Sequence, residues 1–325
     1  MIFVENNNMD PYVNHALEEW LMENYDDDCF MLWRNEKALL LGRNQNVRSE
    51  INLEAAKEHG VKIVRRITGG GTVYTDDGTI MFTFICGSGR GFADFKHFSE
   101  PVVSAVRSLG INAEFSGRND LTIDGMKFSG NAQCTYQGKL LHHGTLMYST
   151  DIGAMAELLR VNKLKLQDKG VSSVKSRVTN ISDFMDTPMD IEKFRSYLFN
   201  KVMESDKNAV FLRLTDNQWN KVREKAKEKH ALHQWIYGQS PEFNIKKEAK
   251  FTGGMVQVYL NEKGGRIESA SIFGDFFGDR DISVLENVLS GVSYTREAIN
   301  EALSNVSFNE YLHNISLDEF ISAIL

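Results

Sequence analysis

The start of the chain has the spacing of an amphipathic helix. Asp10 followed by Pro11 is the usual order of an N-cap and a first-turn proline. Apolar residues then recur three and four positions apart, at Val13, Ala16, Leu17, Trp20 and Leu21. We therefore expect a helix that buries one face near the beginning of the fold.

Short apolar runs bounded by polar turns predict strands, whereas longer segments with helical spacing predict helices. The predicted strands cover residues 29–33, 38–41, 61–67, 72–74, 79–85 and 140–148. The predicted helices cover residues 53–59, 95–109, 152–159, 191–202 and 216–230. Strands and helices alternate without the regular repeat of a doubly wound sheet, so the pattern favours an α+β fold.

A change of pattern near residue 240 predicts a second unit. The turn-rich stretch 235–244 follows the last predicted helix, and a hairpin of strands 250–260 and 266–273 comes after it. Residues 284–325 have a mostly helical pattern. Because 325 residues exceed the usual size of one hydrophobic core, we expect a large domain at 1–244 and a small α+β domain at 245–325.

Composition narrows the classes of function. The net charge is −7 and the sequence has no long basic run, which argues against a dedicated nucleic-acid-binding protein. No apolar run is long enough to span a bilayer, and the N-terminus lacks the features of a signal peptide. The three cysteines include no Cys-x-x-Cys pair and favour a reducing compartment. We therefore expect a cytoplasmic protein without a nucleic-acid or membrane partner.

The dipeptide Asp124-Gly125 is a strong hairpin signal, since both central positions of a type I′ turn need positive φ. Counting from this turn pairs Ile123 with Met126, Thr122 with Lys127, Leu121 with Phe128 and Asp120 with Ser129. Alternation places the apolar residues of these pairs on one face, and Asp120, Thr122, Lys127 and Ser129 on the other. The polar face has the groups that a site for an anion and a metal would need. An amphipathic surface hairpin with a solvated lysine explains the same pattern.

Three glycines, Gly69, Gly70 and Gly71, lie between two β-rich runs and follow Arg65 and Arg66. Glycines free the backbone to turn sharply and to present several N–H groups to a phosphate or carboxylate. The segment matches neither a Walker A loop nor a dinucleotide-binding fingerprint, because no Lys-Ser/Thr follows and no helix opens after the glycines. Strand alternation lets only one of the two arginines face such a ligand. A tight hairpin turn is the alternative interpretation.

The remaining candidates are histidines and cysteines. His142 and His143 are adjacent in a predicted strand, and they lack the matching Cys, Asp or Glu spacing of a zinc site, so we expect a core or pocket-wall histidine. Cys29 and Cys86 lie in apolar strands, where cysteine usually behaves as a small buried hydrophobe. Cys134 is a weak candidate for a nucleophile.

Five segments taken together resemble the ordered motifs of the lipoate-protein ligase A family. They are Arg65-Arg-Ile-Thr-Gly-Gly-Gly-Thr-Val-Tyr74, Gly117-Arg-Asn-Asp120, Lys127-Phe-Ser-Gly-Asn-Ala-Gln133, His143-Gly-Thr-Leu146 and Ser173-Val-Lys-Ser-Arg-Val-Thr-Asn180. The C-terminal segment is similar in size and pattern to that family's accessory domain. The resemblance implies a biotin/lipoate ligase-type catalytic domain with mixed β-sheets flanked by helices, plus a small α+β accessory domain.

The resemblance also implies a reaction in two steps. ATP and lipoate would give lipoyl-AMP and pyrophosphate. The lipoyl group would then move to a lysine of an acceptor lipoyl domain, such as the glycine-cleavage H protein or the E2 subunit of a 2-oxoacid dehydrogenase. The sequence does not distinguish between these acceptors, or between lipoate and octanoate.

Roles for single residues follow from the same match. Lys127 is expected to be catalytic and to contact both nucleotide and lipoate. The residues expected to hold ATP and the adenylate are Arg66, Gly71, Thr72, Val73 and Tyr74. Those expected to border the lipoate pocket are Gly70, His143 and Gly144. Asp120 is the expected Mg²⁺ ligand, since phosphate-bound Mg²⁺ prefers hard oxygen donors. Residues 173–180 resemble the family's adenylate-covering loop.

Two alternatives stay open. A related group transfers octanoyl or lipoyl groups through a cysteine thioester without ATP, but residues 149–188 contain no cysteine. A non-catalytic lipoate-binding protein would retain the pocket alone. The sequence also departs from many relatives at Thr75-Asp76, where these have His-Asp.

Overall fold

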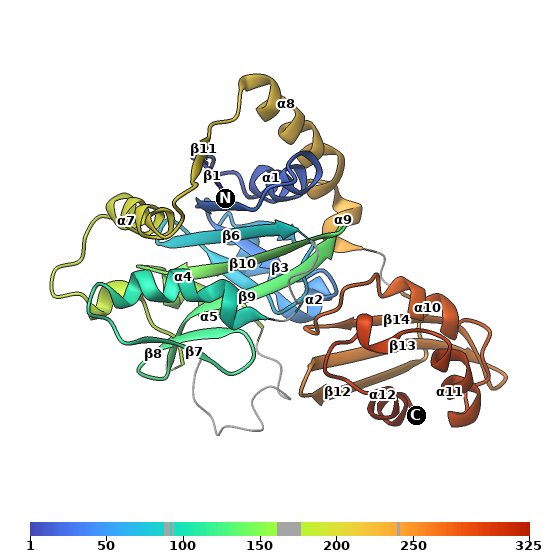
Figure 1. The fold of residues 1–325 in the computed structure, drawn as a ribbon. Helices are drawn as coiled ribbons and strands as arrows, with labels where there is room; N and C mark the ends of the chain where they lie inside the picture. The colour runs from blue at the N-terminus through green and yellow to red at the C-terminus, as the bar shows by residue number, and fades with distance from the viewer. Residues whose placement is uncertain (88–91, 93, 161–176, 239–240) are drawn as a thin grey trace.

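A computed structural model describes residues 1–87, 92, 94–160, 177–238 and 241–325, which form a large and a small part (Figure 1). The large part is organised around an eight-stranded mixed sheet with the order β11-β1-β2-β6-β10-β9-β8-β7. Its strands are β1 (Ile2–Val4), β2 (Cys29–Trp33), β6 (Thr79–Gly87), β7 (Ala113–Ser116), β8 (Asp120–Ile123), β9 (Met126–Tyr136), β10 (Lys139–Met147) and β11 (Val210–Leu212). Strand β1 pairs in parallel with β11 and β2, and the other pairs are antiparallel.

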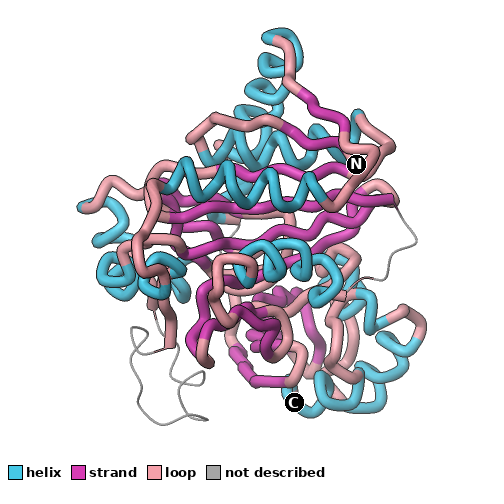
Figure 2. The backbone as a smooth tube through the Cα atoms, turned by 60° about the vertical axis from the view of Figure 1, so that its left-hand side comes forward, coloured by secondary structure: helices cyan, strands magenta, loops and turns pink. Residues whose placement is uncertain are grey.

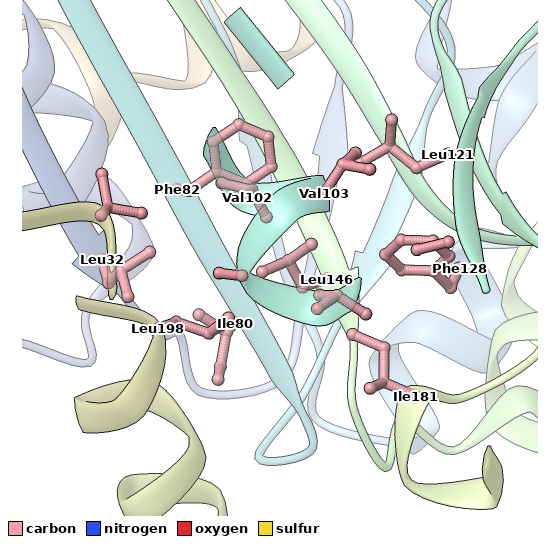
Figure 3. Close-up of a cluster of buried hydrophobic side chains, with 14 of the residues drawn as sticks. Leu32, Ile80, Phe82, Val102, Val103, Leu121, Phe128, Leu146, Ile181 and Leu198 are labelled. Carbon is pink, nitrogen blue, oxygen red and sulfur yellow. The ribbon is translucent and has the colours of Figure 1, made fainter. Parts of the chain in front are cut away.

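Helices cover both faces of this sheet, as the tube in Figure 2 shows. Helices α4 (Phe95–Arg107) and α7 (Ile191–Glu204) bury their apolar sides against one face. In Figure 3, Val102 and Val103 of α4 lie among Phe82, Phe128 and Leu146 of the sheet. The opposite face packs against α1 (Pro11–Asn24) and α8 (Asp216–Lys225), which continues into a π-helical turn, η3 (Ala226–His230).

A second, three-stranded sheet positions the glycine-rich segment. Strand β3 (Ala38–Leu41) lies between β4 (Lys62–Arg65), which is parallel to it, and β5 (Val73–Thr75), which is antiparallel. The elements packed around this sheet are α2 (Val47–Glu50), α3 (Leu53–Glu58), α5 (Ile152–Leu158) and α9 (His233–Tyr237). Because the glycines connect β4 to β5, both ends of their loop are fixed in one sheet.

The small part has its own sheet and core. Strands β12 (Ile245–Phe251), β13 (Gly254–Lys263) and β14 (Arg266–Gly274) form an antiparallel sheet. The helical segments around it are α10 (Ser283–Leu289), α11 (Arg296–Ser304), η4 (Phe308–Glu310) and α12 (Leu317–Ile324). Their buried side chains pack on Val256, Val258 and Ile272 of the sheet. A last short turn, η2 (Ile181–Phe184), belongs to the large part.

The predicted α+β class and most predicted elements are confirmed, but several boundaries were wrong. Residues 250–260 are not one strand, because β12 ends at Phe251 and β13 begins at Gly254. A Cβ at Gly253 would lie 2.2 Å from the His313 carbonyl oxygen, so this turn packs closely on a neighbouring loop. Strand 61–67 ends at Arg65, and part of the turn-rich stretch 235–244 belongs to α9. Within the described residues, no helix combines the length and apolarity needed to cross a membrane.

The hairpin around Asp124 differs from its predicted register by a bulge. Asp124 and Gly125 have φ of 50° and 79°, as a type I′ turn requires. The first two pairs form as predicted, but the register then shifts, so that Leu121 lies opposite Ser129 and Asp120 opposite Gly130. Local turn chemistry fixes the first pairs, whereas an extra residue further along the strand displaces the others.

His142 and His143 face opposite sides of the sheet, and His142 belongs to the core. Its ring is fully buried and stacks on Phe98 with 5.4 Å between the ring centroids. Its Nδ1 lies 3.0 Å from Gln133 Nε2, which can only donate, so Nδ1 accepts and the proton of the neutral ring is on Nε2. Burial lowers the pKa of His142 well below its usual value, and the nearby His143 acts in the same direction.

This burial predicts a pH dependence of stability. The unfolded chain protonates position 142 below about pH 6.5, whereas the folded protein keeps it neutral, so the free energy of unfolding falls as pH decreases below that value. In His142→Phe the slope of unfolding free energy against pH becomes shallower, by an amount that rises toward about 1.4 kcal/mol per pH unit as pH falls from 6.5 to 5. Denaturant unfolding at several pH values measures it. His97→Gln, an exposed position on α4, is the control, and equal slopes for His142→Phe and wild type contradict the prediction.

Candidate functional site

One cavity brings together most of the residues that the sequence predicted. It lies between the glycine loop, β9 and β10. The predicted residues that line it are Arg66, Gly70, Gly71, Thr72, Val73, Lys127, His143 and Gly144. The structure adds Met81, Asn119, Gly130, Asn131, Ala132 and Thr145. Tyr74 does not line this cavity, because its side chain is buried in the core around β3. Asp120 does not line it directly either, but contacts Lys127.

Lys127 and Asp120 share one face of the hairpin, as expected. The Lys127 ammonium lies 2.7 Å from Asp120 Oδ1, and both side chains are more than a third exposed. A Cβ at Gly130 would lie 2.9 Å from the Lys127 nitrogen, so the lysine side chain runs over this glycine. Sequence reasoning missed Gly130, because the bulge that brings it opposite Asp120 has no local signal.

The backbone of Lys127 is held from a distant segment. Its N–H donates to the Arg177 carbonyl oxygen, and its own carbonyl oxygen accepts from the Thr179 N–H, each at 2.9 Å. This is a parallel bridge between Lys127 and Val178. Of the expected covering loop 173–180, residues 177–180 are described and 173–176 lie outside the described residues. The described end of that segment is therefore joined to the strand that carries Lys127.

The three glycines have three different surroundings. A Cβ at Gly69 would lie 2.5 Å from the Phe276 carbonyl oxygen and 3.2 Å from the Phe277 ring. Gly70 has a φ of +88°, which side-chain-bearing residues rarely adopt, and it also contacts Phe277. A Cβ at Gly71 would have no atom within 4 Å. Only Gly71 therefore leaves space beside the cavity, whereas Gly69 accommodates the small C-terminal part.

The two arginines of the motif point in opposite directions, as strand alternation predicted. Arg66 donates to the carbonyl oxygens of Gly69 and Gly71 at 2.9 Å each, to Thr68 Oγ1 at 3.1 Å and to the Leu40 carbonyl oxygen. These bonds use four of its five N–H groups within the described structure. Burial lowers the pKa of Arg66 to about 10, so the guanidinium is still charged at neutral pH.

Arg65 binds the loop that precedes α2. Its Nη1 donates to the carbonyl oxygens of Gly42, Arg43 and Gln45 at 2.7 to 3.0 Å. Its other nitrogens donate to the carbonyl oxygens of Trp235 and Ile236. Arg65 therefore connects the glycine loop's strand to a loop and a helix that are far away in the sequence.

His143 lines the cavity as part of a buried hydrogen-bond network. Its Nδ1 lies 2.8 Å from Glu18 Oε1, and its Nε2 lies 2.9 Å from Thr68 Oγ1. Glu18 also accepts from Thr83 Oγ1 and bonds His15 Nδ1, each at 2.8 Å. A carboxylate can only accept, so His143 Nδ1 carries a proton and donates it to Glu18 Oε1.

Glu18 was missed by sequence reasoning, although helical spacing could have found it. It precedes Leu21 by three positions on the predicted helix and therefore shares that helix's buried face. Burial favours its protonated form, but the charges and hydrogen bonds of His143 and His15 outweigh this and lower its pKa below the usual value. The ligand atoms of His15, Glu18 and His143 lie within 4.8 Å of one another. Their direct hydrogen bonds of 2.8 Å already explain this proximity.

The cysteines have the surroundings of structural residues. All three are buried. Burial raises the pKa of Cys29 to about 12 and also raises that of Cys134. A nucleophilic cysteine needs a lowered pKa and access to its substrate. These surroundings weigh against thioester chemistry at either residue.

Comparisons with known proteins agree with this site and fold. The model of the lipoyl protein ligase A/B catalytic domain matches residues 10–203, and the model of the bacterial lipoate protein ligase C-terminus matches residues 240–324. Both parts of the chain therefore match domains of lipoyl protein ligases, and this defines the class of protein. The chain belongs to the lipoate-protein ligase A family.

Individual relatives cover nearly the whole chain. The chain is 40% identical over 313 residues to lipoate-protein ligase LplJ of Bacillus subtilis (strain 168), covering 94% of this chain and 95% of that protein. It is similar to the crystal structure of P. falciparum LipL1 in complex with lipoate, with a TM-score of 0.80, 25% identity and coverage of 99% and 97% of the two chains. It has the fold of lipoate-protein ligase A bound with ATP, with a TM-score of 0.59, 24% identity and coverage of 73% and 96%.

The different surroundings of the glycines predict different effects of the same substitution. Gly69→Ala forces a methyl group against the Phe276 backbone, and overpacking of this kind typically costs about 1–3 kcal/mol. Gly71→Ala has no such contact and is expected to unfold at nearly the wild-type denaturant concentration. Denaturant melts of both variants beside wild type measure the difference. Equal destabilisation by the two substitutions would contradict the assignment of Gly69 to the contact with the small part.

Proposed function

We propose that this chain is an ATP-dependent lipoate-protein ligase that joins lipoate to AMP, releases pyrophosphate, and then transfers the lipoyl group to a lysine of an acceptor lipoyl domain. Family membership, the relative that holds lipoate and the relative that holds ATP support this proposal. The observation that carries it is the position of Lys127. Its ammonium is presented to a cavity that it shares with the glycine loop.

The first step needs a cation at this place. The lipoate carboxylate must attack the α-phosphate, and the two groups repel each other because both are negatively charged. An ammonium between them lowers this repulsion and aligns the reacting oxygens. Lys127 pairs with Asp120 in the structure. We propose that binding of the two anions draws the lysine away from that carboxylate, and that it afterwards stabilises the acyl oxygen during transfer.

The guanidinium of Arg66 places a positive charge on the nucleotide side of the cavity. Arg66 is buried and charged, and it holds Gly69 and Gly71 by their carbonyl oxygens, which fixes the course of the loop. One N–H group of its guanidinium is not used by the described protein atoms, and we propose that it donates to the nucleotide. The backbone from Gly71 to Tyr74 would hold the rest of the adenylate, with Tyr74 contributing main-chain atoms only because its side chain is buried elsewhere.

The lipoate side of the cavity is formed by less polar groups. We assign Met81 and Ala132 to this side together with Gly70, His143 and Gly144, all of which line the cavity. An aliphatic tail and a dithiolane ring are bound by apolar contact. A Cβ at Gly144 would lie 2.3 Å from Asn131 Oδ1 and 2.5 Å from the Phe82 ring, so a side chain at this position would collide with the cavity wall.

Asp120 fits a magnesium site at the nucleotide. Its carboxylate is partly exposed beside the ammonium that we assign to the phosphates. Mg²⁺ in nucleotide sites is commonly bound by one or two carboxylates and the substrate's own phosphate oxygens. When bound there, the ion would neutralise phosphate charge. Asp120 would hold it after releasing Lys127.

Further assignments complete the proposal. We assign residues 1–244 to the catalytic domain and 245–325 to the accessory domain, with lipoyl domains of a glycine-cleavage H protein or of a dehydrogenase E2 subunit as acceptors. Residues 173–180 would help to exclude water from the adenylate, which hydrolyses readily. A cytoplasmic location agrees with the use of ATP and with the buried free thiols of Cys29 and Cys134.

A single assay tests the function. The purified protein is mixed with lipoate, Mg-ATP and an unmodified lipoyl domain, and pyrophosphate release and the mass of the acceptor are followed. We expect ATP-dependent acylation in the wild type and a loss of about 10²–10³-fold in pyrophosphate release in Lys127→Ala, as for other single groups that stabilise charge in a transition state. Lys263→Ala, an exposed lysine of β13, is the matched control.

Other results of this assay would refute the proposal. Acylation that needs no ATP but depends on a cysteine would identify a transferase. Lipoate binding without turnover would identify a carrier protein. Full activity of Lys127→Ala would remove this lysine from the mechanism.

A further inference from the structure

A second loop lies directly against the glycine loop. It comprises residues 42–46, between β3 and α2. The Arg43 N–H donates to the Thr68 carbonyl oxygen at 2.8 Å. A Cβ at Gly42 would lie 1.9 Å from the Gly70 carbonyl oxygen, so only glycine permits this approach. The side chain of Gln45 lies between the two loops, and only 1% of this residue is exposed to solvent.

The amide oxygen of Gln45 receives two hydrogen bonds. The Gly42 N–H donates to Gln45 Oε1 at 2.9 Å, and the Thr72 hydroxyl donates to the same oxygen at 2.8 Å. A backbone N–H can only donate, so the atom that faces it must be the amide oxygen and not the nitrogen. The orientation of the Gln45 amide is therefore fixed, and with it the direction of the Thr72 proton.

The other end of the amide is less well satisfied. Gln45 Nε2 is buried and has no hydrogen-bond partner among the described residues. Leaving a buried donor without a partner is unfavourable. The backbone of Gln45 is nevertheless held in place, since its carbonyl oxygen accepts from Arg65 at 2.7 Å. The fold thus holds Gln45 Oε1 in its hydrogen bond with Thr72, although Nε2 makes no hydrogen bond with the described residues.

This arrangement restricts what Thr72 can bind. A hydroxyl has one proton to donate and two lone pairs to accept with. Thr72 lines the cavity and is only partly buried, and its proton is already used by Gln45. It therefore faces a ligand as an acceptor. Ionised phosphate oxygens and the lipoate carboxylate have no proton to give, so they do not match it. The hydrogen-bond donors of the proposed substrates are the ribose hydroxyls and the 6-amino group of adenine.

We propose that Gln45 is a positioning residue that makes Thr72 an acceptor for one hydrogen-bond donor of the adenosine part of ATP, and that this pair contributes to the choice of nucleotide. The inference rests on the proposed function and deepens it. Thr72 would recognise the nucleotide away from the reacting phosphate. Its loss would therefore weaken ATP binding more than it slows the chemical step.

The experiment compares nucleotide analogues across variants. Pyrophosphate release with saturating lipoate is measured for ATP, 2′-deoxy-ATP, 3′-deoxy-ATP and purine riboside triphosphate, which lacks the 6-amino group. In the wild type we expect one analogue to raise KM about fivefold to tenfold, the worth of one hydrogen bond of about 1–1.4 kcal/mol. In Thr72→Val we expect the KM for ATP to rise by the same factor, with kcat nearly unchanged. The analogue that was affected in the wild type is expected to show no further rise in KM in this variant. The analogue affected identifies the donor.

Two further variants separate positioning from folding. Thr72→Ser keeps the hydroxyl and is expected to restore the wild-type KM. Gln45→Glu keeps an acceptor for both Gly42 and Thr72 and is expected to retain the discrimination between analogues, whereas Gln45→Met removes the acceptor and is expected to abolish it. Thermal melts of each variant show whether the protein is folded.

The results can fail in two distinct ways. A wild type that releases no pyrophosphate from lipoate and ATP refutes the proposed function. Two results in an active wild type overturn the role of Thr72 alone. One is an unchanged KM for ATP in Thr72→Val, and the other is a rise in KM by the same factor for ATP and every analogue in that variant. Loss of discrimination in folded Gln45→Glu as well as in folded Gln45→Met overturns the role of Gln45.

Discussion

The site depends on two neighbouring guanidinium groups that are buried without a carboxylate bonded to them in the described structure. Alternation along β4 sends Arg65 to the loop before α2 and Arg66 to the glycine loop. Both donate to backbone carbonyl oxygens of the loops that they face. Because charged hydrogen bonds of this kind are stronger than neutral ones, each loop has one preferred course. The hydroxyl of Thr72 and the backbone N–H groups around it take their positions from that course.

Helix α1 supplies the negative charge that accompanies these cations. Glu18 bonds His143, His143 bonds Thr68, and Thr68 accepts from Arg66, so a continuous chain of hydrogen bonds joins the first helix to the glycine loop. The next residue of the same helix, Glu19, forms an ion pair with Lys229 at 2.9 Å. Two adjacent carboxylates of α1 therefore lie in the same part of the fold as two adjacent buried guanidinium groups. These hydrogen bonds hold the side chains of the site in fixed positions, and polar groups held in this way need little rearrangement during a reaction.

The sequence predicted features that depend on neighbouring residues, such as a turn or the direction of a side chain on a strand. It did not predict contacts between segments that are far apart in the sequence. The Asp124-Gly125 turn predicted that Lys127 and Asp120 share a face, because turn residues fix the pairing next to them. It could not reveal the bulge, which shifts the register beyond the first two pairs. Strand periodicity predicted that Arg65 and Arg66 diverge, but not that Arg65 reaches the carbonyl oxygens of Trp235 and Ile236. Glu18 was missed because its partners Thr83 and His143 lie on strands that are distant in the sequence, although its place on the helix indicated burial. The functional roles of these residues stay predictions.

The close contact at Gly69 also limits how far the chain can be shortened. Phe277 packs with Phe95 and Ala132 and touches Gly69 and Gly70, and Arg118 lies 4.8 Å from the centre of its ring. A truncated version that ended before the small part would uncover these apolar groups of the large part and the inner side of the glycine motif. Anyone designing a minimal enzyme from this chain would have to supply a substitute for one phenyl ring. A smaller residue at position 277 would not free position 69 to vary, because the backbone carbonyl of Phe276 would still meet any side chain there.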